Sequence, residues 1–270
     1  MKEMYVALSG AVSREKQLAL VANNLANVNS VGFKKDDMVF QVRPPGVDFV
    51  LLEKSASPEL NLPTPRQRIE GDRNYVRATG SVTNFSTGEL RPTERSLDMA
   101  LVTKGPDRAT PFFVVQTPAG ERLTRAGDFA LNESQEMATR DGYRVLSTAG
   151  QPIQVTGSPS EAVYVSPSGD ISKGGQDIGS MRVVLAERPD RLVKTGNGLF
   201  SDPSGAAQVR DAQADDGVSV RQNLLEMANV NVVAELVKMI EIQRTYTALQ
   251  KTIQTIDEAS SRTITGALSA

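Results

Sequence analysis

The residues that could carry out chemistry are few in this chain. Its 270 residues include no His, no Cys and no Trp. A Ser-His-Asp triad, a Cys nucleophile and an imidazole or thiolate metal site are therefore excluded. Two carboxylate pairs remain, Asp36-Asp37 and Asp215-Asp216, but adjacent acids in loops are more typical of solvated turns than of acid/base pairs. We predict no enzyme activity, no catalytic residues, no metal site and no cofactor.

Charge and hydropathy exclude further classes of function. The 30 Lys and Arg residues against 32 Asp and Glu residues leave a net charge of −2, which favours neither nucleic acid nor an anionic membrane as a partner. The glycines at 169, 174 and 175 have the spacing of a phosphate loop without its Lys and Ser/Thr. The longest apolar runs, residues 4–8 and 18–22, are too short for a membrane span or a signal peptide. We expect no small-molecule substrate, no membrane insertion and no cleaved signal.

The positions of proline and glycine indicate which elements surround these residues. All 14 prolines lie between Pro44 and Pro203, and residues 218–265 contain no glycine. Because proline breaks helices and glycine weakens them, we expect two helical ends around a turn-rich centre.

The N-terminal end has the periodicity of a helix over about residues 3–28. Apolar residues follow alternating steps of four and three, interrupted only by Glu15. The expected seam consists of Met4, Leu8, Ala11, Leu18, Ala22 and Leu25.

The C-terminal end shows the same spacing from Leu225 to Ile256, interrupted by Glu235. Its start is ambiguous, since Asn223 with Glu226 forms a capping-box pattern while Asn229 or Asn231 could cap a later helix. Further apolar residues, including Val233, widen the apolar surface beyond what a two-helix contact needs. The expected seam and its flank include Val232, Leu236, Met239, Ile242, Tyr246, Leu249, Ile253 and Ile256.

The central part has the pattern of short strands separated by turns. Strands are expected over residues 112–116, 122–125, 129–132, 143–147, 151–155, 162–166 and 181–187. The predicted fold is α+β: terminal helices that pair as a coiled-coil-like inner domain, and a central, mainly antiparallel β domain. The expected divisions are 1–40, an extended Pro-rich connection over 41–75, the β domain over 76–220, and 221–270.

The seams have two interpretations. Each helix could pack on the β domain alone, with Glu15 and Glu235 reaching solvent. Alternatively, the helices pair with each other and with neighbouring copies, which their length and wide apolar surface favour. We therefore expect a homo-oligomer with the seam residues at its interfaces.

Several runs then resemble one family. The run ANNLANVNSVGFKK at residues 22–35 resembles the N-terminal signature of the flagellar rod and hook proteins, and residues 226–258 resemble the matching C-terminal signature. Residues 112–132 with DGYRVL at 141–146 resemble the β domain of the rod members. The motif residues are Asn23, Asn24, Leu25, Asn27, Asn29, Gly32, Phe33, Asn229 and Asn231.

This resemblance implies an axial structural subunit of the bacterial flagellar basal body. Such a subunit is exported by the flagellar type III apparatus, joins other rod proteins in the cell envelope and serves cell motility. It assembles helically to transmit torque from motor to hook, with the terminal helices forming the inner tube of the rod. The opening MYVALSGA and the QTPAGERLTR hairpin are most similar to the proximal-rod members.

Other readings stay open. The distal-rod members are the closest alternative within the family, and two segments, residues 41–75 and 105–111, depart from the usual rod pattern. A carboxylate-dependent cell-wall hydrolase or a surface adhesin would belong to different classes of function.

Overall fold

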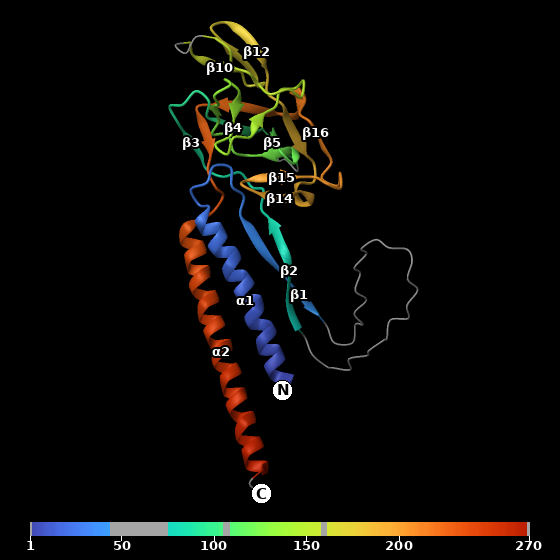
Figure 1. The fold of residues 1–270 in the computed structure, drawn as a ribbon, viewed down its shortest axis with the longest axis vertical. Helices are drawn as coiled ribbons and strands as arrows, with labels where there is room; N and C mark the ends of the chain where they lie inside the picture. Colours follow the sequence, from blue (N-terminus) through green and yellow to red (C-terminus); the bar gives the residue numbers. More distant parts are fainter. Residues whose placement is uncertain (1, 44–74, 105–108, 158–160, 269–270) are drawn as a thin grey trace, which may run out of the picture. The chain divides into compact units, whose positions relative to one another are not determined.

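The computed structural model describes residues 2–43, 75–104, 109–157 and 161–268 (Figure 1). Over these residues, helix α1 (Lys2–Ala26) lies at the N-terminal end and helix α2 (Val232–Leu268) at the C-terminal end. The chain between them forms mainly antiparallel strands. The predicted α+β class and the two helical ends are confirmed. Most of the Pro-rich connection expected over residues 41–75 lies outside the described residues.

The strands are short, as a sequence rich in turn residues requires. They are β1 (Asp36–Arg43), β2 (Tyr75–Thr83), β3 (Leu90–Pro92), β4 (Met99–Thr103), β5 (Thr110–Thr117), β6 (Gly120–Thr124), β7 (Ala130–Leu131), β8 (Met137–Ala138), β9 (Arg144–Val145), β10 (Val163–Val165), β11 (Asp170–Lys173), β12 (Gln176–Ser180), β13 (Val183–Ala186), β14 (Val193–Gly196), β15 (Leu199–Ser201), β16 (Val209–Asp211), β17 (Val218–Gln222) and β18 (Leu224–Glu226). Two 3₁₀ turns, Pro189–Arg191 and Ala214–Asp216, complete the secondary structure of the described residues.

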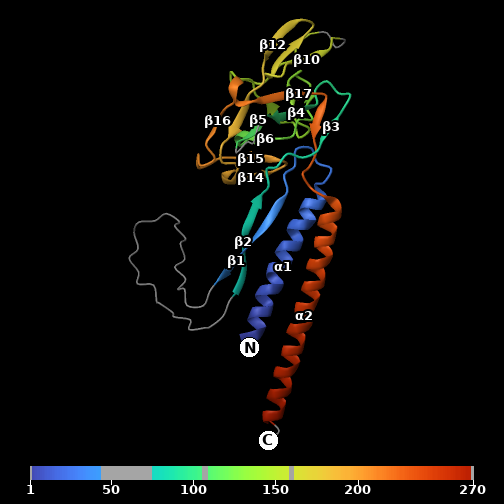
Figure 2. The ribbon, with the colours of Figure 1, turned by 180° about the vertical axis from the view of Figure 1, so that it is seen from behind.

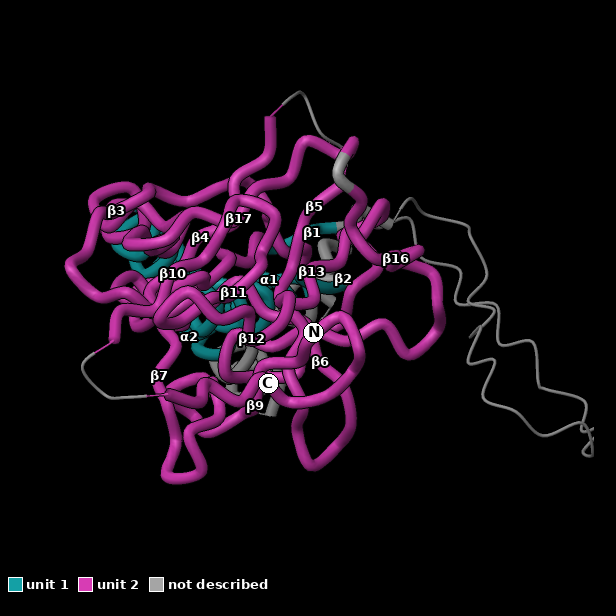
Figure 3. Tube along the Cα trace, turned by 90° about the horizontal axis from the view of Figure 1, so that it is seen from above, with its two compact units in different colours: residues 1–20, 38–81, 238–270 teal, residues 21–37, 82–237 magenta. Residues whose placement is uncertain are grey.

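The chain divides into two compact units (Figure 3). Unit 1 contains Met1–Leu20, Met38–Ser81 and Lys238–Ala270, and unit 2 contains Val21–Asp37 and Val82–Val237. Each unit is therefore assembled from segments that are far apart in the sequence.

In unit 1, α1 and α2 run side by side in opposite directions (Figures 1 and 2). Small residues on α1 allow a close approach, since a Cβ atom added to Gly10 would lie 3.4 Å from Cδ1 of Leu249. Ala7 and Ala11 are buried on the same helix, and Ile242 is buried on α2. Strands β1 and β2 pair as a two-stranded ribbon.

Unit 2 is built on a nine-stranded sheet. Seven of its strands lie in the order β14-β15-β6-β5-β9-β8-β7, and of the other two β13 pairs with β5 and β16 pairs with β13. Alternate side chains of β5 point to opposite faces, because side chains alternate along a strand. Phe113 and Val115 join one buried cluster with Phe129, whereas Phe112 and Val114 join another with Phe200. Both faces of β5 are thus covered, which makes it the centre of the unit.

Most of the expected strands are found. Strands occur within six of the predicted ranges, but residues 151–155 contribute only isolated bridges, such as Leu146 to Pro152. The ambiguity at the start of α2 is also resolved. Asn231 caps the helix, with its Oδ1 accepting a hydrogen bond of 3.0 Å from the N–H of Ala234. The alternative capping box at Asn223 and Glu226 is wrong, because Glu226 ends strand β18.

Candidate functional site

The segments that flank the two helices meet inside unit 2. Residues 27–37, which follow α1, contact the segment between β18 and α2, and Gly32 lies at the crossing. Its N–H donates a hydrogen bond of 2.7 Å to the carbonyl oxygen of Glu226. Gly32 has φ +66°, and an added Cβ would lie 2.4 Å from the backbone of Arg125 and Ala126. Only glycine fits both the left-handed conformation and this close approach.

Asn24 fixes the path of the chain after α1. Its side chain is fully buried. Nδ2 donates to the carbonyl of Asp36 at 2.9 Å, and Oδ1 accepts from the N–H of Asp36 at 3.1 Å. The amide thus pairs with both backbone groups of one residue, as a neighbouring strand would.

Asn229 performs the same role before α2. Its Oδ1 accepts from the N–H of Lys35 at 2.8 Å, and its Nδ2 donates to the carbonyl oxygens of Asn84 at 2.8 Å and Ser86 at 3.1 Å. One side chain therefore ties together the segment after α1, the chain before β3 and the entry to α2. The residues ANVN occur at 26–29 and again at 228–231. The side chain of Asn27, which corresponds to Asn229, bonds within the described residues only to the carbonyl of Asn23 and to Ser30.

A buried ion triad lies beside this crossing. Nζ of Lys34 is 2.5 Å from Oε1 of Glu226, and the guanidinium of Arg125 contacts Oε2 of the same carboxylate. The three side chains are at most 3% exposed. Each cation also donates to a backbone carbonyl: Lys34 to that of Ser86 at 2.8 Å and Arg125 to that of Pro111 at 2.8 Å. Nε of Arg125 is buried without a hydrogen-bond partner among the described residues.

Burial and charge act in opposite directions on the three pKa values. Burial lowers the pKa of Lys34 to about 8, although Glu226 opposes the shift. Burial also lowers the pKa of Arg125. For Glu226, burial alone would raise the pKa, but the two cations outweigh it and hold the pKa below its usual value. The triad consequently keeps a carboxylate ionised in the interior and links three segments of unit 2.

A second polar contact holds Phe33. Nζ of Lys194 lies 4.2 Å from the centre of the Phe33 ring and 3.0 Å from Oδ2 of Asp36, and it donates to the carbonyl of Lys34 at 2.7 Å. Oδ1 of Asp36 accepts from Thr83 at 2.6 Å. Asp36, which the sequence suggested as one of a pair of carboxylates for acid/base chemistry, is therefore held in a structural ion pair with Lys194.

Two of the other candidates for carboxylate chemistry, Asp37 and Asp216, are also held in ion pairs. Asp37 lies 3.4 Å from Lys35, and both oxygens of Asp216 bond to Arg210 at 2.7 Å. Within the described residues, no three His, Cys, Asp or Glu side chains form a group that could hold a metal ion.

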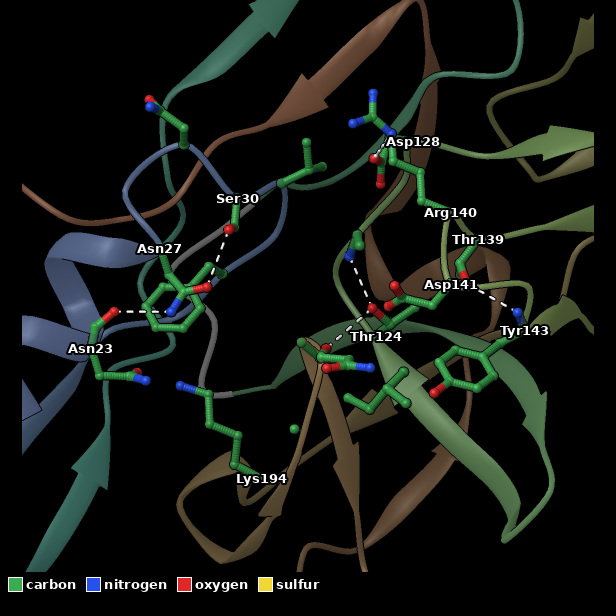
Figure 4. A pocket seen from close by; sticks show the side chains of 18 residues that line it. Asn23, Asn27, Ser30, Thr124, Asp128, Thr139, Arg140, Asp141, Tyr143 and Lys194 are labelled. Atoms are coloured by element: carbon green, nitrogen blue, oxygen red, sulfur yellow. Dashed lines mark hydrogen bonds and ion pairs between the residues drawn. The ribbon is translucent and has the colours of Figure 1, made fainter.

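A polar cavity of about 620 Å³ opens beside Phe33 (Figure 4). Asn23, Asn27 and Ser30 lie on one side of it, and Thr139 and Tyr143 lie on the other. The cavity is also lined by the β14–β15 turn and by an ion pair of 2.9 Å between Arg140 and Asp128.

The expected seam of α2 matches the less exposed face of that helix. Ile242 is 3% exposed, and the residues at the following seam positions are half-buried: Tyr246, Leu249, Ile253 and Ile256. Met239 is half-buried too. Val232 and Leu236, in contrast, are about 40% exposed.

The buried face of α1 is offset from the expected seam. Ala11 is buried and Leu18 and Leu25 are half-buried, as steps of four and three require. Leu8 and Ala22 are exposed, however, and the buried positions are Ala7 and Val21, one residue earlier. Both registers share residues 4, 11, 18 and 25. At the alternating positions each register has two apolar residues and one charged residue, Arg14 or Glu15, so periodicity alone does not distinguish them.

The two seam glutamates differ. Glu15 is exposed, whereas Glu235 is 4% exposed and lies in the first turn of α2. Access to solvent therefore explains why a carboxylate can interrupt the seam at Glu15, but it does not explain the carboxylate of Glu235.

Three functional residues were missed by sequence reasoning. Lys34 and Glu226 lie inside the quoted runs, where Glu226 also fits a capping-box pattern, and Arg125 lies in an expected strand. The only signal for Lys34 is its position beside the Gly-Phe turn, and for Glu226 its position beside the second Asn-rich segment. Opposite charges far apart in the sequence show no pattern.

Three family models match parts of this chain. The family described as flagella basal body rod protein matches residues 4–34, the flagellar hook protein FlgE/F/G D1 domain matches 109–173, and the flagellar basal body rod FlgEFG protein C-terminal family matches 221–265. None of the described helices is long and apolar enough to cross a membrane.

Relatives match over nearly the whole chain. The flagellar basal-body rod protein FlgF of Caulobacter vibrioides is 31% identical over 262 residues, covering 95% of this chain and 94% of the relative. FlgG of Bacillus subtilis is 31% identical over 270 residues, covering 96% of each chain, and FlgG of Borreliella burgdorferi is 29% identical over 269 residues, covering 95% of each. The resemblance seen in the sequence is confirmed: this chain belongs to the flagellar basal-body rod protein family.

Proposed function

We propose that this chain is a structural subunit of the bacterial flagellar rod, which assembles helically and transmits torque from the motor to the hook. The observation that carries this proposal, beside family membership, is a row of exposed apolar side chains on α2. Val233 is 70% exposed, and Leu236, Val237 and Ile240 follow it at helical spacing. Such a row is stabilised when neighbouring subunits cover it.

Within the rod we propose the proximal position. The relatives include both FlgF and FlgG proteins at about equal identity, so the distal position is the second candidate. The proximal position is favoured by the similarity of the opening residues and of the hairpin between β5 and β6 to the proximal-rod members.

The terminal helices pair as a coiled-coil-like inner domain in this proposal. The contact of Leu249 with Gly10 and the half-buried seam from Met239 to Ile256 support the pairing. The exposed apolar residues, including Leu8, Val12 and Val232, are then available to neighbouring copies and to other rod proteins. Export by the flagellar type III apparatus and a place in the cell envelope follow from membership of a rod.

The chain acts here as a structural component and not as an enzyme. Asp36 and Asp216 support this, because their carboxylates are engaged in ion pairs with Lys194 and Arg210.

Electron microscopy of basal bodies purified from a strain lacking this gene tests the proposal. Rings without a stable rod are expected for a proximal subunit. A rod that stops before its distal segment would move the chain to the distal position. Intact rods and hooks in the deletion strain, identical to those of the same strain with the gene restored, would contradict a role in the rod.

A further inference from the structure

The cavity beside Phe33 has an unusual polar lining. Of its charged groups, Asp128 is paired with Arg140 at 2.9 Å, and Lys194 is paired with Asp36 at 3.0 Å. The remaining carboxylate, that of Asp141, is exposed and can accept hydrogen bonds. The lining therefore favours a ligand that forms many hydrogen bonds.

The cavity also offers amide groups. Asn23, Asn29 and Asn197 line it, and within the described part of the chain their side chains form no hydrogen bonds. An Asn side chain carries a carbonyl acceptor and an N–H donor side by side. The amide carbonyl can accept from a backbone N–H, and the amide N–H can donate to a backbone carbonyl.

The same molecule already uses this pairing three times. Asn24 holds both backbone groups of Asp36, and Asn229 holds the backbone of Lys35 and Asn84. Gln222 accepts from the N–H of Val165 at 3.2 Å and donates to the carbonyl of Val163 at 2.8 Å, along the edge of β10. In each case a side-chain amide accepts from one backbone N–H and donates to a backbone carbonyl.

We infer that the cavity binds an extended peptide segment of a second copy of this chain, held by the amides of Asn23, Asn29 and Asn197. The inference rests on the proposed function, because a helical assembly needs heterologous contacts, in which a hollow on one copy receives a different surface of the next. The cavity measures about 620 Å³, within the range of about 300–1,000 Å³ that ligand-binding cavities usually have.

Photocrosslinking tests which molecule fills the cavity. Asn29 is exposed and is replaced by p-benzoylphenylalanine in the full chain, expressed in the flagellated bacterium. Glu133, exposed and outside the cavity lining, receives the same group as the control. After irradiation of purified basal bodies, mass spectrometry is expected to find a peptide of this same chain joined to position 29 and not to position 133.

Variants then test the amides. Asn197 has φ +49°, and Asn223, outside the cavity lining, has φ +60°. Glycine tolerates both conformations, so Asn197→Gly and Asn223→Gly remove an amide without backbone strain. Asn197→Gly combined with Asn29→Ala should lower the copies of this chain per basal body about 10-fold, as expected for the loss of one or two hydrogen bonds. Asn223→Gly should leave the number unchanged.

The outcomes separate the inference from the proposed function. Absence of the wild-type chain from basal bodies would overturn both. Wild-type incorporation, with a glycan or a different protein crosslinked at position 29 or no crosslink at all, would overturn only the inference. Equal incorporation of the double variant and the wild type would do the same.

Discussion

At the scale of single residues, the junction depends on one carboxylate with two cations. Glu226 neutralises Lys34 and Arg125 in a place where all three side chains are nearly excluded from water. A buried pair adds little stability relative to a well-packed apolar core, but removal of one partner is costly because it leaves an uncompensated charge. Glu226 is therefore the residue whose loss should matter most.

The Glu226→Gln variant should lose about 3–5 kcal/mol of unfolding free energy at pH 7. Urea denaturation measures this loss, with Glu133→Gln as the control, an exposed glutamate whose change should stay within about 0.5 kcal/mol. A loss as small as that of the control would show that the triad does not support the fold.

The same carboxylate should make stability depend on pH. Its pKa in the folded chain is below the usual 4.5, so the unfolded chain takes up the proton first as the pH falls. The stabilisation is present above pH 4.5 and is lost as the pH drops below that value toward the folded pKa. The difference between the wild type and Glu226→Gln should therefore narrow below pH 4.5 in urea denaturation. A difference that stays constant down to the acid limit of folding would contradict the assignment.

Gly32 gives a separate prediction at this scale. Gly32→Ala adds the strain of φ +66° and a collision with the backbone beside Arg125, whereas Gly142→Ala adds strain at φ +84° with nothing within 4 Å. Left-handed strain costs about 1–3 kcal/mol, and both variants should show it. Gly32→Ala should be further destabilised by the collision, which thermal unfolding of the two variants measures. Equal melting temperatures would contradict this prediction, because they would mean that the backbone around Gly32 moves to accommodate the added methyl group at no cost.

At the scale of elements, the helices were largely predictable and the junction was not. Steps of three and four and the absence of proline were sufficient to place α1 and α2. Periodicity could not show whether Ala7 or Leu8 lies on the buried face of α1, because either residue fits the helical spacing. The packing of small residues between the helices determines which one is buried. Periodicity also did not predict strands β1 and β2, which lie on each side of residues 44–74. It could not predict the contact between Lys34 and Glu226, because that contact depends on how the whole of unit 2 folds.

A proline placed in α2 tests the role of that element. Leu249→Pro removes a helical hydrogen bond and costs about 3 kcal/mol or more, at a residue that packs on Gly10. Because the core of unit 2 contains no residue beyond Val237, the β domain should still fold and resist protease while incorporation into basal bodies fails. Leu249→Met is the control, because it keeps the helical N–H and an apolar side chain of similar volume. Incorporation of Leu249→Pro at the level of Leu249→Met would contradict an interface role for this helix.

At the scale of the whole molecule, the two units have different sources of stability. Unit 2 contains both apolar clusters, the triad and the paired amides, whereas unit 1 depends on helices whose apolar residues are only partly covered within one chain. A subunit built in this way can keep a folded β domain before assembly and gain the rest of its stability from neighbouring copies.

This difference predicts the behaviour of a fragment containing residues 21–237. It keeps all of unit 2 and the chain that connects its parts, so it should unfold cooperatively in urea and show dispersed backbone NMR signals. Glu226→Gln should destabilise the fragment as much as the full chain, because the triad lies entirely within unit 2. In a strain lacking the gene, the fragment should fail to restore rods, since it lacks residues 238–270 and most of α1. A fragment that does not fold would show instead that the helices of unit 1 are required for the β domain, and restored rods would remove the helices from the assembly.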